Sequence, residues 1–180
     1  MSQDYIKKIL FTNDEIIARC SELGKEITKE YADKNLLVIG LLKGCIPFMA
    51  ELIKHIECDC EIDFMAVSSY GDETVSSGDV RILKDLDRSV KGYDVVIAED
   101  ICDTGRTLKV VKELLLSRGA KSVKIACLLD KKERRIVEME PDLVGFSIPD
   151  AFVVGFGLDY CQKMRNLPYV GVLKEEIYQK

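Results

Sequence analysis

The chain has 180 residues and a formal net charge of -5, with 47% hydrophobic and 32% charged residues. This composition predicts a single domain over residues 1–180 with a sizeable core, and the acidic balance argues against a protein held by nucleic-acid phosphates. No apolar run reaches the roughly 18–20 residues that span a bilayer, and the N-terminus lacks the layout of a signal peptide, so we expect a cytoplasmic protein with no membrane and no nucleic-acid partner.

The first half of the chain alternates helical and extended patterns. Thr12 and Glu15 have the spacing of a helix capping box, and apolar residues recur at helical intervals after them. A continuous apolar run over residues 36–42 predicts a central parallel strand, and Pro47 is well placed in the first turn of the next helix. Strands are then expected over residues 61–69 and 80–84, joined by a polar loop over 70–79.

The second half repeats this alternation. A strand is expected over residues 94–99, followed by a helix over 106–118 that Gly119 ends. Strands alternating with helices predict an α/β domain with a mainly parallel, twisted sheet flanked by helices. The charge run over residues 131–135 is expected to be a solvated loop face. Further extended segments are predicted over 122–129, 143–148, 151–155 and 170–173.

Seven cysteines and a single histidine narrow the possible chemistry. The cysteines are odd in number and scattered through apolar segments, which predicts reduced core residues rather than a disulfide framework. Cys58 and Cys60 form a C-x-C pair, but no second pair follows at zinc-ligand spacing. His55 lies in a helical pattern, so neither a Ser-His-Asp hydrolase nor a histidine-rich zinc site is expected.

The stretch from Val95 to Leu108 carries the strongest signal of chemistry. Its apolar run stops at two adjacent carboxylates, Glu99 and Asp100, and Asp103 follows before a small loop and a helix. Ligands bind at the carboxyl ends of parallel strands, and a helix N-terminus can bind phosphate. The acids can hold sugar hydroxyls or metal, or can transfer a proton. Since neither a P-loop nor a G-x-G-x-x-G fingerprint is present, the stretch predicts a different kind of phosphate site.

This stretch closely resembles the phosphoribosyl pyrophosphate (PRPP) motif of type I phosphoribosyltransferases. Four further matches narrow the resemblance to the hypoxanthine-guanine phosphoribosyltransferases. It implies that family's fold, with a small hood formed by the N- and C-terminal segments, and a magnesium-dependent purine salvage enzyme. Such an enzyme transfers the phosphoribosyl group to N9 of hypoxanthine or guanine, gives IMP or GMP and pyrophosphate, and forms a homodimer or homotetramer. The four matches are Leu42-Lys43-Gly44, Ser69-Tyr70-Gly71, Leu129-Asp130-Lys131 and the tail from Ile148 to Tyr160.

The resemblance also implies roles for residues that bind PRPP. Asp103 would accept or donate the proton at purine N7. Glu99 and Asp100 would take the ribose hydroxyls, directly or through magnesium. The 5′-phosphate would lie in the loop of Asp103, Thr104, Gly105, Arg106 and Thr107. The pyrophosphate would meet Leu42, Lys43 and Gly44, with a cis peptide between Leu42 and Lys43, the lid residues Ser69 and Tyr70, and Arg165.

The purine would be read by residues of the second half. Lys131 would donate to the exocyclic O6, and an ammonium group, which has donors only, disfavours the amino group of adenine. Phe152 would stack on the purine ring, and the backbone of Val153 would meet its edge. Asp159 would belong to the purine-binding residues too, and would also bind a second magnesium ion carried by pyrophosphate.

Two other readings stay open at this point. A PRPP-sensing regulator of RNA or DNA could share the fold, although the chain has no added helix-turn-helix segment and no basic excess. Retention of Lys131 and Phe152 favours an enzyme over a sensor. Xanthine could also replace hypoxanthine or guanine as the substrate, with Asp130 influencing the purine 2-position.

Overall fold

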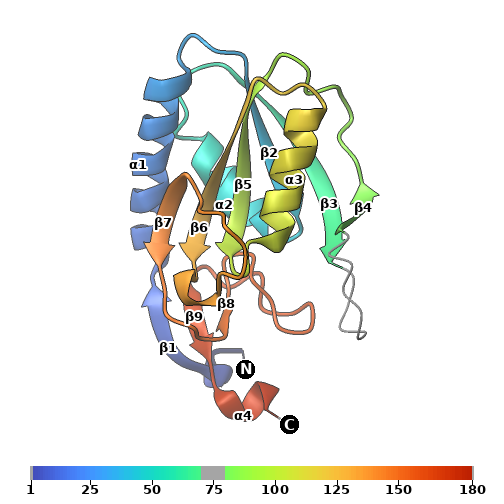
Figure 1. Ribbon diagram of the computed structural model, residues 1–180. Helices are drawn as coiled ribbons and strands as arrows, with labels where there is room; N and C mark the ends of the chain where they lie inside the picture. The colour runs from blue at the N-terminus through green and yellow to red at the C-terminus, as the bar shows by residue number, and fades with distance from the viewer. Residues whose placement is uncertain (1, 70–79, 180) are drawn as a thin grey trace.

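The computed structural model describes residues 2–69 and 80–179, which form two sheets (Figure 1). The larger sheet has six strands in the order β4-β3-β2-β5-β6-β7. Neighbouring strands run parallel except β3 and β4, which are antiparallel. The mainly parallel sheet predicted from the sequence is therefore confirmed. The strands are β2 (Leu36–Leu42), β3 (Cys60–Ser69), β4 (Val80–Lys84), β5 (Asp94–Cys102), β6 (Ser122–Asp130) and β7 (Leu143–Ser147).

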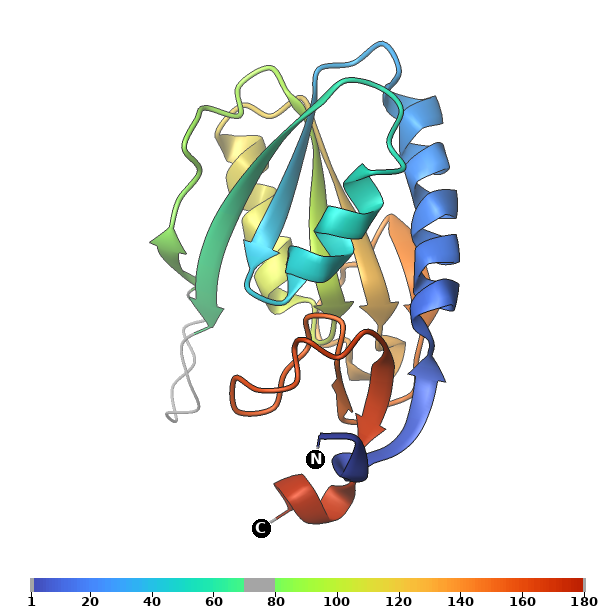
Figure 2. The ribbon, with the colours of Figure 1, turned by 180° about the vertical axis from the view of Figure 1, so that it is seen from behind.

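Helices cover both faces of this sheet. Helices α1 (Asn13–Tyr31) and α2 (Cys45–Ile53) lie on the face opposite α3 (Arg106–Ser117), as Figure 2 shows from behind. Residues along β5 alternate between the two faces: Val96 packs with α1 and α2, whereas Val95 and Ile97 pack with α3. Because both faces are buried, the central strands read as continuous apolar runs.

A small second sheet forms the hood that the resemblance implied. It pairs β1 (Ile6–Phe11) with β9 (Val170–Leu173), and β9 with β8 (Val153–Val154), all antiparallel. The short elements η1 (Ser2–Tyr5) and α4 (Glu175–Tyr178) flank it. Figures 1 and 2 place this hood and both chain ends beyond the carboxyl ends of the parallel strands.

Element boundaries differ from the prediction in three places. Strand β5 continues past residue 99 because Ile101 and Cys102 pair with β6. In the segment expected over 151–155, only Val153 and Val154 form a strand. The strand β1 was not predicted, since half of its residues are exposed and its sequence lacks a clear apolar alternation. By contrast, the Thr12–Glu15 capping box at the start of α1 is confirmed.

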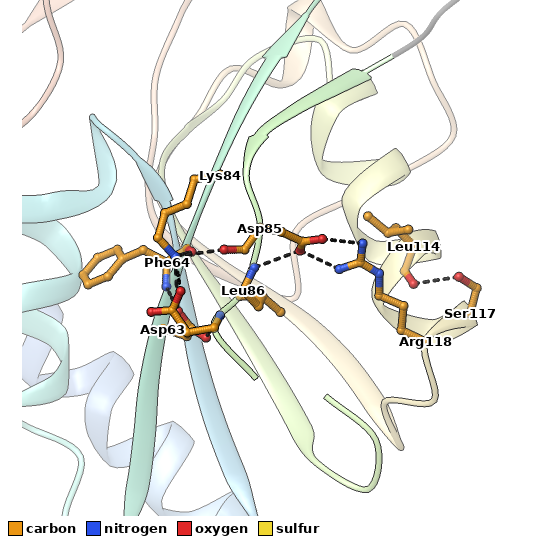
Figure 3. Close-up of polar contacts among 9 residues, drawn as sticks. Asp63, Phe64, Lys84, Asp85, Leu86, Leu114, Ser117 and Arg118 are labelled. Carbon is orange, nitrogen blue, oxygen red and sulfur yellow. Dashed lines mark hydrogen bonds and ion pairs between the residues drawn. The ribbon is translucent and has the colours of Figure 1, made fainter. Parts of the chain in front are cut away.

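A polar network fastens β4 to its surroundings (Figure 3). Lys84 Nζ donates to the carbonyl oxygens of Phe64 at 3.0 Å and Asp85 at 2.9 Å. Both guanidinium Nη atoms of Arg118, at the end of α3, donate to Asp85, at 2.6 and 2.8 Å. These bonds hold the pKa of Asp85 below its usual value. The antiparallel edge strand is thus tied both to β3 and to a helix on one face of the sheet.

Four of the seven cysteines are buried core residues, as the composition predicted, whereas Cys58 and Cys60 are partly buried and Cys161 is exposed. All seven are free thiols, and burial raises the pKa of Cys20, Cys45 and Cys102 to about 12, so these three stay protonated at neutral pH. Within residues 2–69 and 80–179, no helix has the length and apolar character needed to cross a bilayer.

Candidate active site

A cavity of about 280 Å³ opens at the carboxyl ends of β2 and β5. It brings together three segments that the sequence predicted to act jointly: the loop after β2, the carboxylates of β5 and the start of α3. Its lining residues are Leu41, Leu42, Gly44, Val67, Glu99, Asp100, Ile101, Asp103, Thr104, Gly105, Thr107 and Leu108.

The start of α3 forms one side of this cavity. Gly105 is the N-cap residue and has φ +82°, a conformation that favours glycine. Having no side chain, it gives the helix no side-chain cap, although Arg106 N donates to Thr104 Oγ1 at 3.5 Å. N–H groups at such a helix start can bind an anion. Thr104 and Thr107 add hydroxyl groups to the lining, whereas the Arg106 side chain is exposed.

The two carboxylates near the end of β5 have few hydrogen-bond donors around them. Glu99 Oε2 is buried and has no hydrogen-bond partner, and Asp100 Oδ1 accepts from its neighbour Ile101 N at 2.9 Å. Burial, followed by the charge of Asp100, raises the pKa of Glu99 well above its usual value. Burial also raises the pKa of Asp100 to about 6. A ligand that brings donors or positive charge would relieve this pair.

The loop after β2 approaches these carboxylates closely. The peptide bond between Leu42 and Lys43 is cis, as the resemblance implied. A Cβ atom on Gly44 would lie 1.6 Å from Asp100 Oδ2, so only glycine fits beside that carboxylate. Gly157 approaches from the other side, where its Cβ would lie 1.9 Å from Gly44 O. The tail loop, which joins β8 to β9 over residues 155–169, therefore packs directly against the loop predicted to bind pyrophosphate.

Asp159 and Arg165, in that tail loop, are paired with each other. Arg165 Nη2 lies 2.7 Å from Asp159 Oδ1, and Arg165 Nη1 donates to Gly157 O at 2.8 Å. The charges of both side chains act on the pKa of Asp100, which Arg165 lowers and Asp159 raises, although neither residue lines the cavity.

The predicted purine residues lie at the hood side of the same strand ends. Lys131 is buried, and its backbone N–H donates to Cys102 O at 2.9 Å. Phe152 stacks on Tyr178 at a centroid distance of 4.9 Å and meets Tyr160 edge-on at 5.8 Å. Val153 pairs with Val172 in the hood sheet. The residues predicted to read the base therefore come from β6 and the hood, next to the carboxylates of β5.

Comparisons with known proteins decide the family. Residues 7–161 match the phosphoribosyl transferase domain family. The chain is 58% identical over 180 residues to the hypoxanthine-guanine phosphoribosyltransferase of Streptococcus thermophilus (strain CNRZ 1066), covering 100% of both chains. It is 61% identical over 175 residues to the enzyme of that name from Lactococcus lactis, covering 97% of this chain and 95% of the relative. The chain belongs to the hypoxanthine-guanine phosphoribosyltransferase family.

Solved structures agree with this family assignment. A hypoxanthine phosphoribosyltransferase from Staphylococcus aureus superposes with a TM-score of 0.96 at 49% identity, over 99% of this chain and 97% of that one. The family resemblance, the fold and the transferase class predicted from the sequence are thus confirmed.

Two arginines of this phosphoribosyltransferase site were missed by the sequence analysis, which treated residues 131–135 as a solvated face. That expectation is wrong for Arg135, whose buried guanidinium donates to Asp103 O and Asp130 Oδ1. Arg135 therefore links the loop over residues 103–105, between β5 and α3, to the end of β6. Arg134 Nε lies 3.0 Å from Asp103 Oδ1. A run of charged residues has no helical or strand periodicity, so the sequence does not indicate which of its side chains point inward. Their directions are set by the turn after Lys131.

Ser69 and Tyr70 are the remaining predicted residues of the site. Ser69 ends β3, where it pairs with Val80 of β4. Tyr70 and the rest of the predicted lid lie outside the described residues.

The donor set of the family site suits magnesium. Among the described residues, no group of three or more His, Cys, Asp and Glu side chains could hold a metal ion alone. Magnesium, however, is usually bound by one or two carboxylates together with substrate phosphates. Glu99, with its unpartnered Oε2, and Asp100 fit that description.

Proposed function

We propose that this protein transfers the 5-phosphoribosyl group of PRPP to N9 of hypoxanthine or guanine and releases pyrophosphate. One observation carries the proposal: two buried carboxylate oxygens without hydrogen-bond partners, Glu99 Oε2 and Asp103 Oδ1, belong to residues that line one cavity with an uncapped helix N-terminus. The cavity therefore offers acceptors for hydroxyl groups and a proton, and donors for a phosphate. The names of the relatives support the choice of substrates.

PRPP would bind along the edge of the cavity. The backbone N–H groups from Asp103 to Thr107 and the threonine hydroxyls would hold the 5′-phosphate. Glu99 and Asp100 would accept the ribose hydroxyls. The pyrophosphate would extend toward Lys43, Gly44 and Arg165, where a guanidinium can meet two phosphate oxygens.

Magnesium would be held by Glu99 and Asp100 at the ribose and by Asp159 at the pyrophosphate. When bound, it offsets the negative charge of the leaving pyrophosphate. Asp159 would have to share or release Arg165, its partner at 2.7 Å.

The transfer itself needs one proton to move on the protein. Purine N9 attacks the anomeric carbon of PRPP and forms the new C–N bond. The bond between that carbon and the pyrophosphate oxygen breaks, and its electron pair leaves with the oxygen. The proton on purine N7 then passes to the Asp103 carboxylate, whose Oδ1 has no competing donor in hydrogen-bond geometry. Inversion at the anomeric carbon is expected for this displacement.

The base would be selected by charge and shape. Lys131 Nζ would donate to the exocyclic O6, which disfavours adenine because its amino group at that position also donates. Phe152 would stack on the ring, and the backbone of Val153 would meet the base edge.

The remaining expectations rest on family membership. We propose one catalytic domain over residues 1–180, acting in the cytoplasm as a homodimer or homotetramer. Its partners would be PRPP and a 6-oxopurine, with no nucleic acid or membrane.

A PRPP-dependent assay tests the proposed function. Purified protein is incubated with magnesium, PRPP and, in turn, hypoxanthine, guanine, xanthine, adenine and uracil, and both pyrophosphate and the nucleotide are measured. Hypoxanthine and guanine should give IMP and GMP. Turnover of adenine or uracil without either 6-oxopurine would sink the substrate claim. Salt-dependent RNA binding without any transfer would favour the regulator instead.

A further inference from the structure

A chain of ion pairs joins the residue proposed to move the proton to the residue proposed to read O6. Arg134 Nε lies 3.0 Å from Asp103 Oδ1, and Arg134 Nη1 lies 3.5 Å from Asp150 Oδ1. Lys131 Nζ lies 3.7 Å from the same oxygen of Asp150. The four charges alternate in sign along this chain, so each carboxylate has a cation beside it.

The turn after β6 directs Arg134 toward the site. Residues Lys132–Arg134 form the short 3₁₀ element η2, in which Arg134 N donates to Lys131 O at 3.1 Å. This turn brings Arg134 back beside Lys131. Lys132 points away, since its side chain is 71% exposed and lies 3.9 Å from Glu140. Neighbouring cations of one charge run therefore have different environments.

The chemistry of a 6-oxopurine explains why such a link would matter. O6 and N7 are neighbours on one edge of the base, so the groups that read them must be held at a matching spacing. Lys131 would donate to O6 while Asp103 accepts the proton of N7. Arg134 contacts Asp103 Oδ1 at ion-pair distance but without hydrogen-bond geometry. Its charge can orient the carboxylate while leaving that oxygen able to accept.

We infer that Arg134 is a positioning residue that orients the Asp103 carboxylate and, through Asp150, fixes it relative to Lys131. This inference rests on the proposed function. Arg134 and Asp150 are about half exposed, so solvent screens their pairs and the expected effect is modest.

The test is a single-turnover measurement with PRPP and hypoxanthine at saturation. Arg134→Met, which removes the charge but keeps an apolar stem, should slow the transfer by about three- to tenfold and change PRPP affinity less than twofold. Arg134→Lys should recover part of this loss, because one ammonium restores the charge but cannot reach two carboxylates as a guanidinium does. Lys132→Met removes the same charge from the neighbouring position and should leave the rate unchanged.

A second background shows whether Arg134 acts through Asp103. In Asp103→Asn protein, adding Arg134→Met should cause no further loss, whereas a purely structural role would slow both backgrounds equally. Equal losses in the two backgrounds, an effect no larger than that of Lys132→Met, or a faster transfer would each overturn the inference while leaving the proposed function intact. A wild-type protein that transfers nothing from PRPP to any base would overturn both.

Discussion

At the scale of single residues, the site concentrates carboxylates where donors are scarce. Glu99 and Asp100 are adjacent, and burial raises the pKa of both. Such a pair opposes folding in the absence of a ligand, because ionised groups lose their hydration. The same pair suits a substrate that arrives with hydroxyl groups and magnesium. The two carboxylates proposed to bind PRPP should therefore lower the stability of the free protein.

This cost gives a prediction for Asp100. Its pKa rises from 3.8 unfolded to about 6 in the fold, so the folded state holds the proton more tightly, and stability falls as the pH rises from about 4 to 6. Asp100→Asn should raise the free energy of unfolding by about 1–3 kcal/mol at pH 7.5, with a smaller gain at pH 5. Urea denaturation of ligand-free protein measures both values. Asp33→Asn, at an exposed carboxylate, is the control, and an Asp100→Asn protein less stable than wild type at pH 7.5 would contradict the account.

At the residue level, the sequence placed together groups that the structure also brings together. The strand end, the acids and the glycine loop around Asp103 line one cavity, and their roles stay predictions. The prediction failed for Arg134 and Arg135, whose directions depend on a 3₁₀ turn and on contacts with Asp103, which is distant in sequence. Ion pairs between segments that are far apart in the sequence follow no periodicity or fixed residue spacing, so sequence patterns do not predict them.

At the scale of elements, β4 depends on contacts beyond its own ladder. It is an edge strand paired only with β3 in the sheet order, and its Leu83 side chain is 61% exposed. Little apolar burial holds it, so the bonds of Lys84 and the Asp85–Arg118 pair take on more weight (Figure 3).

A double-mutant cycle measures that pair. Asp85→Asn, Arg118→Met and the double variant should give a coupling free energy of about 0.5–1 kcal/mol, because a bidentate pair is stronger than most exposed ion pairs. Thermal or urea unfolding supplies the four values, and added salt should reduce the coupling. Additive losses would show that the pair does not fasten β4.

The sequence predicted the bounds of the strands β2, β4 and β9 to the residue. Strands β2 and β9 begin and end where their apolar runs do. A strand that is buried on both faces is apolar along its whole length, so the ends of the run mark the ends of the strand. Exposed or very short strands such as β1 and β8 are set by pairing partners far along the chain. Their positions follow from the tertiary fold, which local patterns do not record.

At the scale of the whole molecule, the residues proposed for the site come from two sheets built from different parts of the chain. The large sheet carries the carboxylates and the loop proposed to bind phosphate, and the hood carries Phe152 and Val153, which are proposed to meet the base. The chain ends complete this hood, since Lys174 N donates to Tyr5 O at 2.9 Å and Ile6 pairs with Leu173. Periodicity predicted the large sheet, whereas the hood was foreseen only through the family resemblance.

The central claim is a division of labour in which Glu99 and Asp100 bind PRPP and Asp103 takes the proton. Single-turnover kinetics of Asp103→Asn, combined with equilibrium binding of PRPP, test it most directly. An amide cannot take up the N7 proton, so transfer to hypoxanthine should slow by roughly 10²- to 10⁴-fold while PRPP affinity changes only a few-fold. A single-turnover rate equal to that of the wild type would contradict the account.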